Sequence, residues 1–435
     1  MAKRIRAKHA IAACGLAGLL LYGIADAARA DEKLAGSIRY SWWGGPVRTQ
    51  KTNAVVDLFV TANPGVAVTR EAGDFNSYWD KLSVQAAAHN QPCAISMQSR
   101  YLDQYARAGV LRPLDDLVAS GAISLRGVAK SVVDTGREPD GKLYMVPYAV
   151  SSFAVVFNRS MMERAGVQAP GPDWSWADFA QIAKQAQPKL PARVKAVALL
   201  GGTSEIFFTW VLGRGEAVFT QTGLGFSKQT LIDWYRFWED VRKAGVTQTA
   251  EVAAEVNRSI IEDAPVALGK VMIDEKPPNQ FEAHLNVLAK ATGDVLDMQK
   301  FPNGPAGPGE LVQSNGISIG SNCNANDTKL AAALTSFWEQ NDEGARIYAS
   351  DNGLVAVDRQ QEAQLTDATA TPPRSRQIRR HQDIIRLAKP MLWPPFYNAI
   401  DKLMVRNYQA VAFGQMTIEA AVDQFFDEAA KLAKQ

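Results

Sequence analysis

The sequence predicts an α/β protein in which helices flank mostly parallel sheets. Short runs rich in β-branched and aromatic residues, such as 36–43 and 66–72, alternate with longer runs of helical periodicity, such as 49–65. This β-α-β order is typical of parallel strands joined by helical crossovers. The composition agrees, because 435 residues with 47% hydrophobic and 21% charged side chains are enough for two or more domains with cores.

The alternation is clearest in the first part of the chain. Val55, Val56 and Phe59 fall on one helical face, and their segment stops at Asn-Pro-Gly, which ends helices. The elements predicted here are, in order, strand 36–43, helix 49–65, strand 66–72, helix 77–92, strand 93–97 and a helix that begins at 101. Ligands of such sheets bind at the carboxyl ends of the strands, so the loops after residues 43 and 97 are candidate site loops.

The rest of the chain is also mixed, and it contains no internal repeat. Trp234 and Trp238 share a helical face with Leu231 and Val241, so we interpret both as core residues, together with the pair Trp174 and Trp176 near a helix cap. The further elements are an extended segment around Pro147, helix 172–190 capped near Ser175, helix 230–245, loop 301–310, strand 311–323, helix 327–340, a breaker-rich stretch at 368–376 and a mostly helical tail from 393.

The N-terminal 30 residues have the pattern of a secretory signal peptide. A basic start, MAKRIRAKH, precedes 16 apolar residues, and Ala28-Arg29-Ala30 supplies small residues for cleavage. We expect the mature chain to begin near Asp31, in the periplasm. Residues 1–30 hold five basic side chains and one acidic one, so their removal lowers the formal charge from +2 to −2.

Charge and motifs exclude several classes of protein. The mature chain has no basic stripe, so no nucleic-acid partner is expected. There is no phosphate-binding loop, nucleophile elbow or metalloprotease motif, and the three mature histidines are scattered, so neither a cofactor nor a metal site nor a catalytic residue is predicted. Cys93 and Cys323 remain after processing; they are either a disulfide or two buried thiols.

Five segments of the chain, taken in order, are distinctive: YWDKLSVQAAAHNQPCAISMQSRYLDQYARAGVLRPLDDLV, DGKLYMVPYAVSSFAVVFNRSMMERAGV, EIFFTWVLGRGEAVF, ALGKVMI and FYNAIDKLMVRNYQAVAFGQMTIEAAVDQFFDEAAKLA. Together they resemble the extracellular solute-binding proteins of bacterial ABC importers, of the sugar-binding type (family 1) related to maltose-binding protein. The likeness covers almost the whole mature chain. One departure is Cys93, which stands where the family has an Asp after Pro92, and both cysteines then fall in one lobe.

The resemblance implies two α/β lobes that close around a ligand. Residues 31–148 with 314–375 would form the N-terminal lobe, and 149–313 with 376–435 the C-terminal lobe, which ends in helices. The segments PYAVSSF and QSNGIS would be the hinge crossings. The implied function is capture of a sugar or oligosaccharide and its delivery to the membrane permease subunits of an ABC importer, by a monomer that is not an enzyme.

Trp42 and Trp43 are the first candidate ligand residues. They end a predicted strand in front of Gly44 and Gly45, and flat rings bury the C–H faces of sugars. Arg48 follows with a planar fork of donors suited to hydroxyls or a carboxylate. Because neighbours on a strand point to opposite faces, we expect one tryptophan, Trp43, to face the ligand.

The resemblance supplies the other candidates position by position. Glu205 matches a carboxylate that binds hydroxyls, and Phe207 and Tyr397 match stacking aromatics. The remaining candidates lie on loops or strand ends that match the family's cleft, and they are Arg100, Tyr148, Ser151, Asp274, Lys276 and Trp393. Arg48 and Arg100 together favour an acidic saccharide. Two alternatives stay open: a non-sugar ligand such as a polyamine, iron or a glycerol phosphoester, and a secreted carbohydrate-active enzyme.

Overall fold

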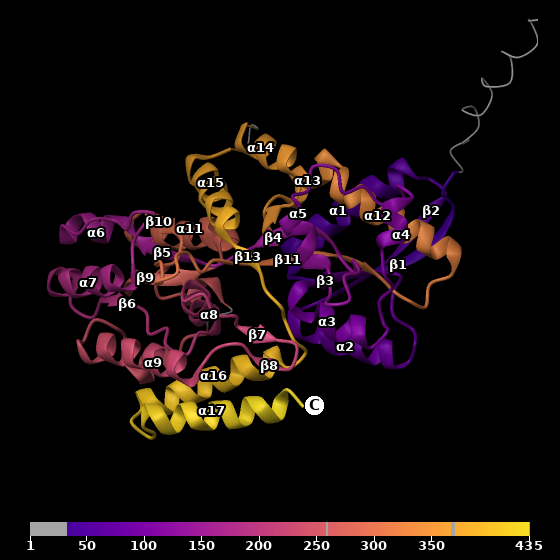
Figure 1. The fold of residues 1–435 in the computed structure, drawn as a ribbon. Coiled ribbons are helices and arrows are strands. Elements are labelled where there is room, and N and C mark those ends of the chain that lie inside the picture. Colours follow the sequence, from indigo (N-terminus) through magenta and orange to yellow (C-terminus); the bar gives the residue numbers. More distant parts are fainter. Residues whose placement is uncertain (1–32, 258–259, 367–369, 435) are drawn as a thin grey trace, which may run out of the picture.

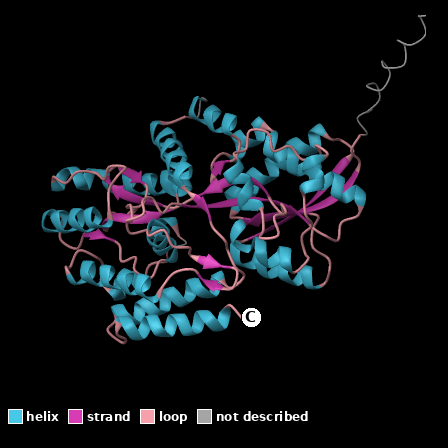
Figure 2. Ribbon diagram, in the orientation of Figure 1, coloured by secondary structure: helices cyan, strands magenta, loops and turns pink. Residues whose placement is uncertain are grey.

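The computed structural model describes residues 33–257, 260–366 and 370–434. It contains two sheets, each covered by helices, which lie side by side in Figure 1: one half is mostly indigo to purple with orange helices added, and the other runs from magenta to yellow. We call the parts built on the two sheets the first and the second lobe. Figure 2 shows the strands in the interior of each lobe and the helices outside them. The α/β fold with a helical C-terminus is thereby confirmed.

The first lobe is built on a seven-stranded sheet with the order β12-β4-β11-β3-β1-β2, to which β13 is added beside β11. Its strands are β1 Gly36–Trp43, β2 Val66–Gly73, β3 Ala94–Gln98, β4 Val146–Ser151, β11 Leu311–Ile319, β12 Leu354–Val355 and β13 Lys389–Pro390. Its helices are α1 Pro46–Ala62, α2 Phe75–Ala87, α3 Ser99–Arg107, α4 Asp115–Ala119, α5 Lys130–Val133, η1 Asp134–Gly136, α12 Ala325–Gln340, α13 Asp342–Tyr348 and α14 Asp358–Thr366.

The second lobe has a four-stranded sheet, β10-β5-β9-β6, and a small hairpin, β7–β8. Its strands are β5 Ala154–Asn158, β6 Lys195–Val197, β7 Phe219–Thr220, β8 Gly223–Leu224, β9 Val271–Lys276 and β10 Leu296–Gln299. Its helices are α6 Arg159–Ala165, α7 Trp176–Ala186, η2 Gln187–Lys189, α8 Ser204–Gly213, α9 Lys228–Lys243, α10 Ala250–Ala254, η3 Ile261–Asp263, η4 Pro278–Gln280, α11 Phe281–Thr292, α15 Pro372–Leu387, α16 Tyr397–Ala412 and α17 Ile418–Leu432.

Both sheets mix parallel and antiparallel pairs. β1 is parallel to β2 and β3, and β6 is parallel to β9, as the βαβ order predicts. β11 is antiparallel to β3 and β4, and β5 is antiparallel to β9 and β10. The antiparallel pairs arise where the chain enters or leaves a lobe, because such a strand returns against its neighbours instead of continuing the crossover series.

Within the described residues, two links join a strand of one sheet directly to a strand of the other. The first is Ser152-Phe153, between β4 and β5, and it lies inside the predicted segment PYAVSSF. The second is 300–310, between β10 and β11. The predicted segment QSNGIS is not this link, because all of β11 is hydrogen-bonded to the strands of the first sheet. The chain crosses between the lobes again before and after β13, because α15 and α16 belong to the second lobe.

Each lobe has its own aromatic core. Trp234 and Trp238 are 0% exposed in the second lobe, as their helical spacing predicts. Ser175 caps α7 in a reciprocal capping box with Asp178, which fixes where that helix starts.

A disulfide closes the first lobe. Cys93 and Cys323 are bonded, with their Cα atoms 5.7 Å apart, and they join residues separated by 230 positions. Of the two alternatives, the structure therefore has the disulfide and not the two free thiols.

The predicted signal peptide lies outside the described residues. Among residues that are described, no helix is both long and apolar enough to span a bilayer.

Candidate ligand site between the lobes

Arg100 of α3 extends from the first lobe to the second. Its Nη1 lies 3.4 Å from the hydroxyl oxygen of Tyr397 and 3.7 Å from Oε1 of Glu205. Its guanidinium carbon also lies 5.8 Å from the centre of the Tyr397 ring. Three residues predicted from the sequence to bind ligand are therefore in contact, one from the first lobe and two from the second.

A chain of amides holds Arg100 in this position. Gln98, the last residue of β3, accepts a hydrogen bond from Nε of Arg100 at 3.0 Å and donates one to Oδ1 of Asn315 at 3.1 Å. Asn315 of β11 in turn donates to the backbone oxygen of Asn352 at 2.7 Å. The strand ends of the first sheet thus orient a cation towards the second lobe.

Carboxylates gather on the second-lobe side. Glu205 lies in the first turn of α8, and the hydroxyl of Tyr397 donates to its Oε1 at 3.4 Å. The adjacent Ser204 donates to Oδ1 of Asp401, which lies on α16 one turn after Tyr397. Burial, the charge of Asp401 and the charge of Glu275 raise the pKa of Glu205 to about 7, against the opposing effect of Arg100.

An aromatic stack leads from the core of the first lobe to the same place. Tyr101 lies flat on Trp79, with ring centres 3.9 Å apart and planes at 15°. Trp79 in turn packs on Trp43, at 5.3 Å between centres. Tyr101 is half-buried and its hydroxyl is hydrogen-bonded by Asn398 of the second lobe, so Tyr101 is the outer ring of the stack.

A second contact between the lobes surrounds Asp351. Arg48 donates to its Oδ2 at 2.7 Å, and Lys51 lies 3.2 Å from its Oδ1. Asn279 of η4 donates to the backbone oxygen of the same Asp351 at 3.2 Å. Arg48 is therefore close to the second lobe, but its guanidinium is paired with Asp351 within the first lobe.

The structure corrects the positions expected for the two tryptophans. Trp43 is 4% exposed and packs against Phe75, Tyr78 and Trp79, so its ring supports Trp79 and offers no free face. Trp42 is 2% exposed and packs on Tyr40, in the other core cluster of the lobe. Strand alternation does separate the two rings, as predicted, but each face of β1 is covered by the lobe's own helices.

Two further aromatic candidates lie in the core of the second lobe. Phe207 is 0% exposed among Phe208, Phe226 and Trp234, because on α8 it faces inward while Glu205 faces Arg100; its predicted role in stacking is corrected to a core role. Trp393 is 4% exposed and packs edge-on against Tyr397, at 4.8 Å between ring centres. It supports the ring of Tyr397 instead of facing the other lobe.

Tyr148 and Ser151 lie on β4. The ring of Tyr148 is 7% exposed and packs on Trp338, and its hydroxyl accepts a hydrogen bond from Asn352 at 3.1 Å. Tyr148 therefore belongs to the first-lobe core. Ser151 is half-buried at the end of β4, opposite Gln313, directly before the link between the lobes.

Asp274 and Lys276 were predicted to bind ligand, but in β9 the residue between them, Glu275, is the one near Glu205. Asp274 is 0% and Lys276 is 3% exposed, and Nζ of Lys276 lies 3.1 Å from Oδ2 of Asp274 within the second lobe. Both act on the pKa of His284, so they lie on the α11 side of β9. Glu275, between them, has its charge near Glu205, as strand alternation requires.

Residues that the sequence reasoning missed are Tyr101, Asp401 and Asp351. Tyr101 was within reach, because it follows Arg100 on the predicted site loop. Asp401 follows Tyr397 by one helical turn, so that spacing was a usable signal once Tyr397 was chosen. Nothing in the local sequence distinguishes Asp351 from the other acidic residues.

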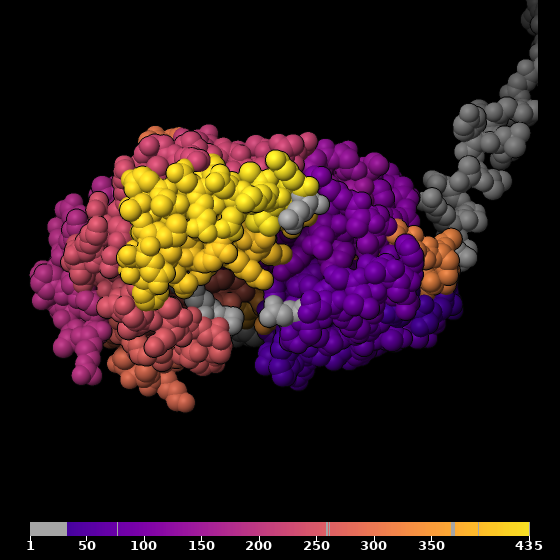
Figure 3. All heavy atoms as spheres, turned by 90° about the horizontal axis from the view of Figure 1, so that it is seen from below, coloured from indigo at the N-terminus to yellow at the C-terminus, as the bar shows by residue number. Residues whose placement is uncertain are grey.

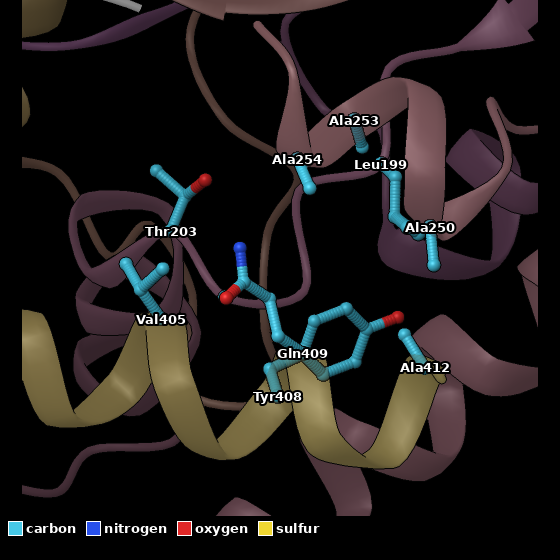
Figure 4. Close-up of a pocket in the computed structure, with 10 residues that line it drawn as sticks. Leu199, Thr203, Ala250, Ala253, Ala254, Val405, Tyr408, Gln409 and Ala412 are labelled. Atoms are coloured by element: carbon cyan, nitrogen blue, oxygen red, sulfur yellow. The ribbon is translucent and has the colours of Figure 1, made fainter. Parts of the chain in front are cut away.

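The surface view agrees with a site between the lobes. Figure 3 shows a hollow between the yellow C-terminal helices and the indigo-to-purple first lobe. A separate cavity of about 100 Å³ lies within the second lobe, where α16, α10 and residues 199–203 meet (Figure 4). None of the predicted ligand residues lines that cavity. Within the described ranges, no group of His, Cys, Asp and Glu is placed to hold a metal ion.

A model of the family described as bacterial extracellular solute-binding protein matches residues 54–373. This chain belongs to that family. The resemblance inferred from the five sequence segments is thereby confirmed, and the family places the protein outside the cytoplasm.

Individual relatives are distant. A putative binding protein of Brucella abortus is 28% identical over 172 residues, which are 38% of this chain and 39% of that protein. The chain thus matches about two fifths of the length of that relative. The solved ABC substrate-binding protein of Listeria monocytogenes, in complex with cycloalternan, has a TM-score of 0.75 at 21% identity over 91% of this chain and 98% of that one. A periplasmic oligogalacturonide-binding protein of Yersinia enterocolitica, with saturated digalacturonic acid, has a TM-score of 0.75 at 17% identity over 92% and 98%.

Proposed function

We propose that this solute-binding protein captures a saccharide between its lobes and delivers it to the permease subunits of an ABC importer. The observation that carries the proposal is the meeting of Arg100 and Tyr101 from the first lobe with Glu205 and Tyr397 from the second. Arg100 and Glu205 are charged groups that can hydrogen-bond hydroxyls, and they lie beside Tyr101, the outer ring of the aromatic stack. These are the two kinds of surface that a sugar requires.

The comparisons support the saccharide. Two proteins with the same fold are solved with cycloalternan and with saturated digalacturonic acid, one a neutral ring and the other an acidic disaccharide. We propose that this chain acts in the same way as a periplasmic monomer, exported by residues 1–30, and that it binds its ligand without converting it.

Of the predicted residues, we keep Glu205 and Tyr397 as ligand contacts and add Tyr101 and Asp401. Arg100 stays at the site as the first-lobe partner of Glu205 and Tyr397. Arg48 is retained at the Asp351 contact, where the lobes meet a second time. Trp43 and Trp393 are proposed as the layer behind Tyr101 and Tyr397.

The test is a binding screen on the mature chain. Thermal shift against neutral, acidic and basic mono- and oligosaccharides should reveal a ligand, since saturation at 100 times Kd stabilises by about 2.7 kcal/mol. Isothermal titration calorimetry then gives the Kd. If no saccharide shifts the melting temperature while a phosphoester or an iron complex does, the saccharide assignment is refuted. Release of new reducing ends during long incubation would instead reveal an enzyme.

A further inference from the structure

The position of Arg100 shows what kind of group the second lobe can hold. Its guanidinium lies beside the carboxylate of Glu205, the hydroxyl of Tyr397 and the ring of Tyr397. A carboxylate, a phenol oxygen and an aromatic face are surroundings that favour a cation. We call Glu205, Tyr397 and the neighbouring Asp401 the cation subsite, because Glu205 and Tyr397 hold a cation from the opposite lobe and the charge of Asp401 acts on Glu205.

One guanidinium does not balance the charge of this subsite. Glu205 and Asp401 both lie on the second-lobe side, and the charge of Glu275 on β9 acts on Glu205 as well. Burial and these two carboxylates raise the pKa of Glu205 to about 7 in spite of Arg100. The charges of Asp401 and Glu275 make the local field at Glu205 negative, and such a field favours a further positive charge.

The other arginine at the lobe interface does not reverse this balance. Arg48 is paired with Asp351, which also takes Lys51 as a partner. This pair lies on the first lobe and meets Asn279, an uncharged side chain. The two arginines that favoured an acidic saccharide in the sequence each have a carboxylate partner in the fold.

We propose that the cation subsite receives a protonated amine of the ligand when the lobes separate, and that Arg100 competes with that amine for the same place. The inference rests on the proposed saccharide binding, and it names an amino saccharide as the ligand class. The ammonium group is the recognised chemistry. A polyamine carries the same group, so the experiment includes one.

The first experiment compares probes that differ in one substituent. Calorimetry measures Kd for glucosamine, galactosamine and mannosamine disaccharides, for the matching disaccharides with hydroxyl in place of amine, for digalacturonate and for spermidine. We expect at least one amino disaccharide to bind about tenfold more tightly than its hydroxyl counterpart, with digalacturonate weakest, because one desolvated charge pair is worth about that factor.

The second experiment removes the competitor. Arg100→Gln should lower the Kd of the amino disaccharide about three- to tenfold, which is the range expected for loss of one partly buried ion pair. It should weaken any binding of digalacturonate. Arg236→Gln, on α9, is the control: it removes the same charge from an exposed pair with Glu419 and should leave each Kd unchanged.

The outcomes separate the inference from the proposed function. Two results would overturn the cation subsite and leave saccharide binding standing. One is that the hydroxyl or acidic saccharides bind as tightly as the amino disaccharide or more tightly. The other is that Arg100→Gln binds the amino disaccharide more weakly than the parent does. Binding of spermidine without any saccharide keeps the subsite and refutes the saccharide. If neither class of amine binds, the inference is wrong.

Discussion

Truncation of Trp43 to alanine should destabilise the first lobe strongly. The side chain is 4% exposed and packs against Phe75, Tyr78 and Trp79 at 5.3–5.9 Å between ring centres. A buried tryptophan removes about 200 Å² of apolar surface from water, which at about 25 cal/mol per Å² is about 5 kcal/mol. Truncations of buried large aromatics cost about 3–5 kcal/mol.

The assay is paired thermal and urea unfolding, followed by circular dichroism. If the first lobe unfolds as a unit, a loss of about 3–5 kcal/mol lowers its melting temperature by about 6–20 °C. Trp43→Phe is the control, since it keeps a ring in the stack and should cost about 1–2 kcal/mol. A variant Trp43→Ala that melts like the parent but loses ligand affinity would refute the packing argument and restore the tryptophan as a ligand contact.

Three further predictions concern stability and motion. Replacing both Cys93 and Cys323 by serine should cost up to about 5 kcal/mol, because the bond closes a loop of 230 residues; an unchanged melting temperature would show that the bond does not constrain the unfolded chain. Burial raises the pKa of Glu310 from 4.5 to about 8, against the charge of Lys300, so the native state binds more protons than the unfolded one and stability should fall as pH rises from about 4.5 to 8. Glu310→Gln keeps an acceptor for the amide of Phe301 and should flatten that slope, measured by urea unfolding at several pH values; the same slope in the variant would contradict the assignment. Addition of a tight ligand to an open form should reduce the radius of gyration in small-angle scattering, and an unchanged radius would contradict lobe closure.

The elements of the fold were largely predictable because their signals are local. The period of Leu231, Trp234 and Trp238 is visible in 8 consecutive residues, and the structure buries all three. The cap at Ser175 is equally local, since its partner Asp178 is three residues away. Strand direction was less predictable, because β11 pairs with strands more than 150 residues earlier in the chain.

The site was predictable only in part, for the same physical reason. Arg100 and Tyr397 are 297 residues apart and Ser204 and Asp401 are 197 apart, so no local pattern brings them together. Trp43 followed the local rule for an exposed strand end, but Trp79 from α2 covers it. The resemblance to the family identified Arg100, Glu205 and Tyr397 as site residues. Only the fold showed that Tyr101 stacks on Trp79, which in turn packs on Trp43.

The central claim is that ligand binds between the lobes against Tyr101. The most direct measurement is the calorimetric Kd of the ligand found in the screen, for Tyr101→Ala beside the control Phe413→Ala, whose ring is 40% exposed at the end of α16. A ring face that covers about 40–60 Å² of sugar is worth about 1–1.5 kcal/mol at about 25 cal/mol per Å². Tyr101→Ala should therefore weaken binding about five- to tenfold while Phe413→Ala binds like the parent. Equal Kd values for the two variants would contradict a ligand site at this place.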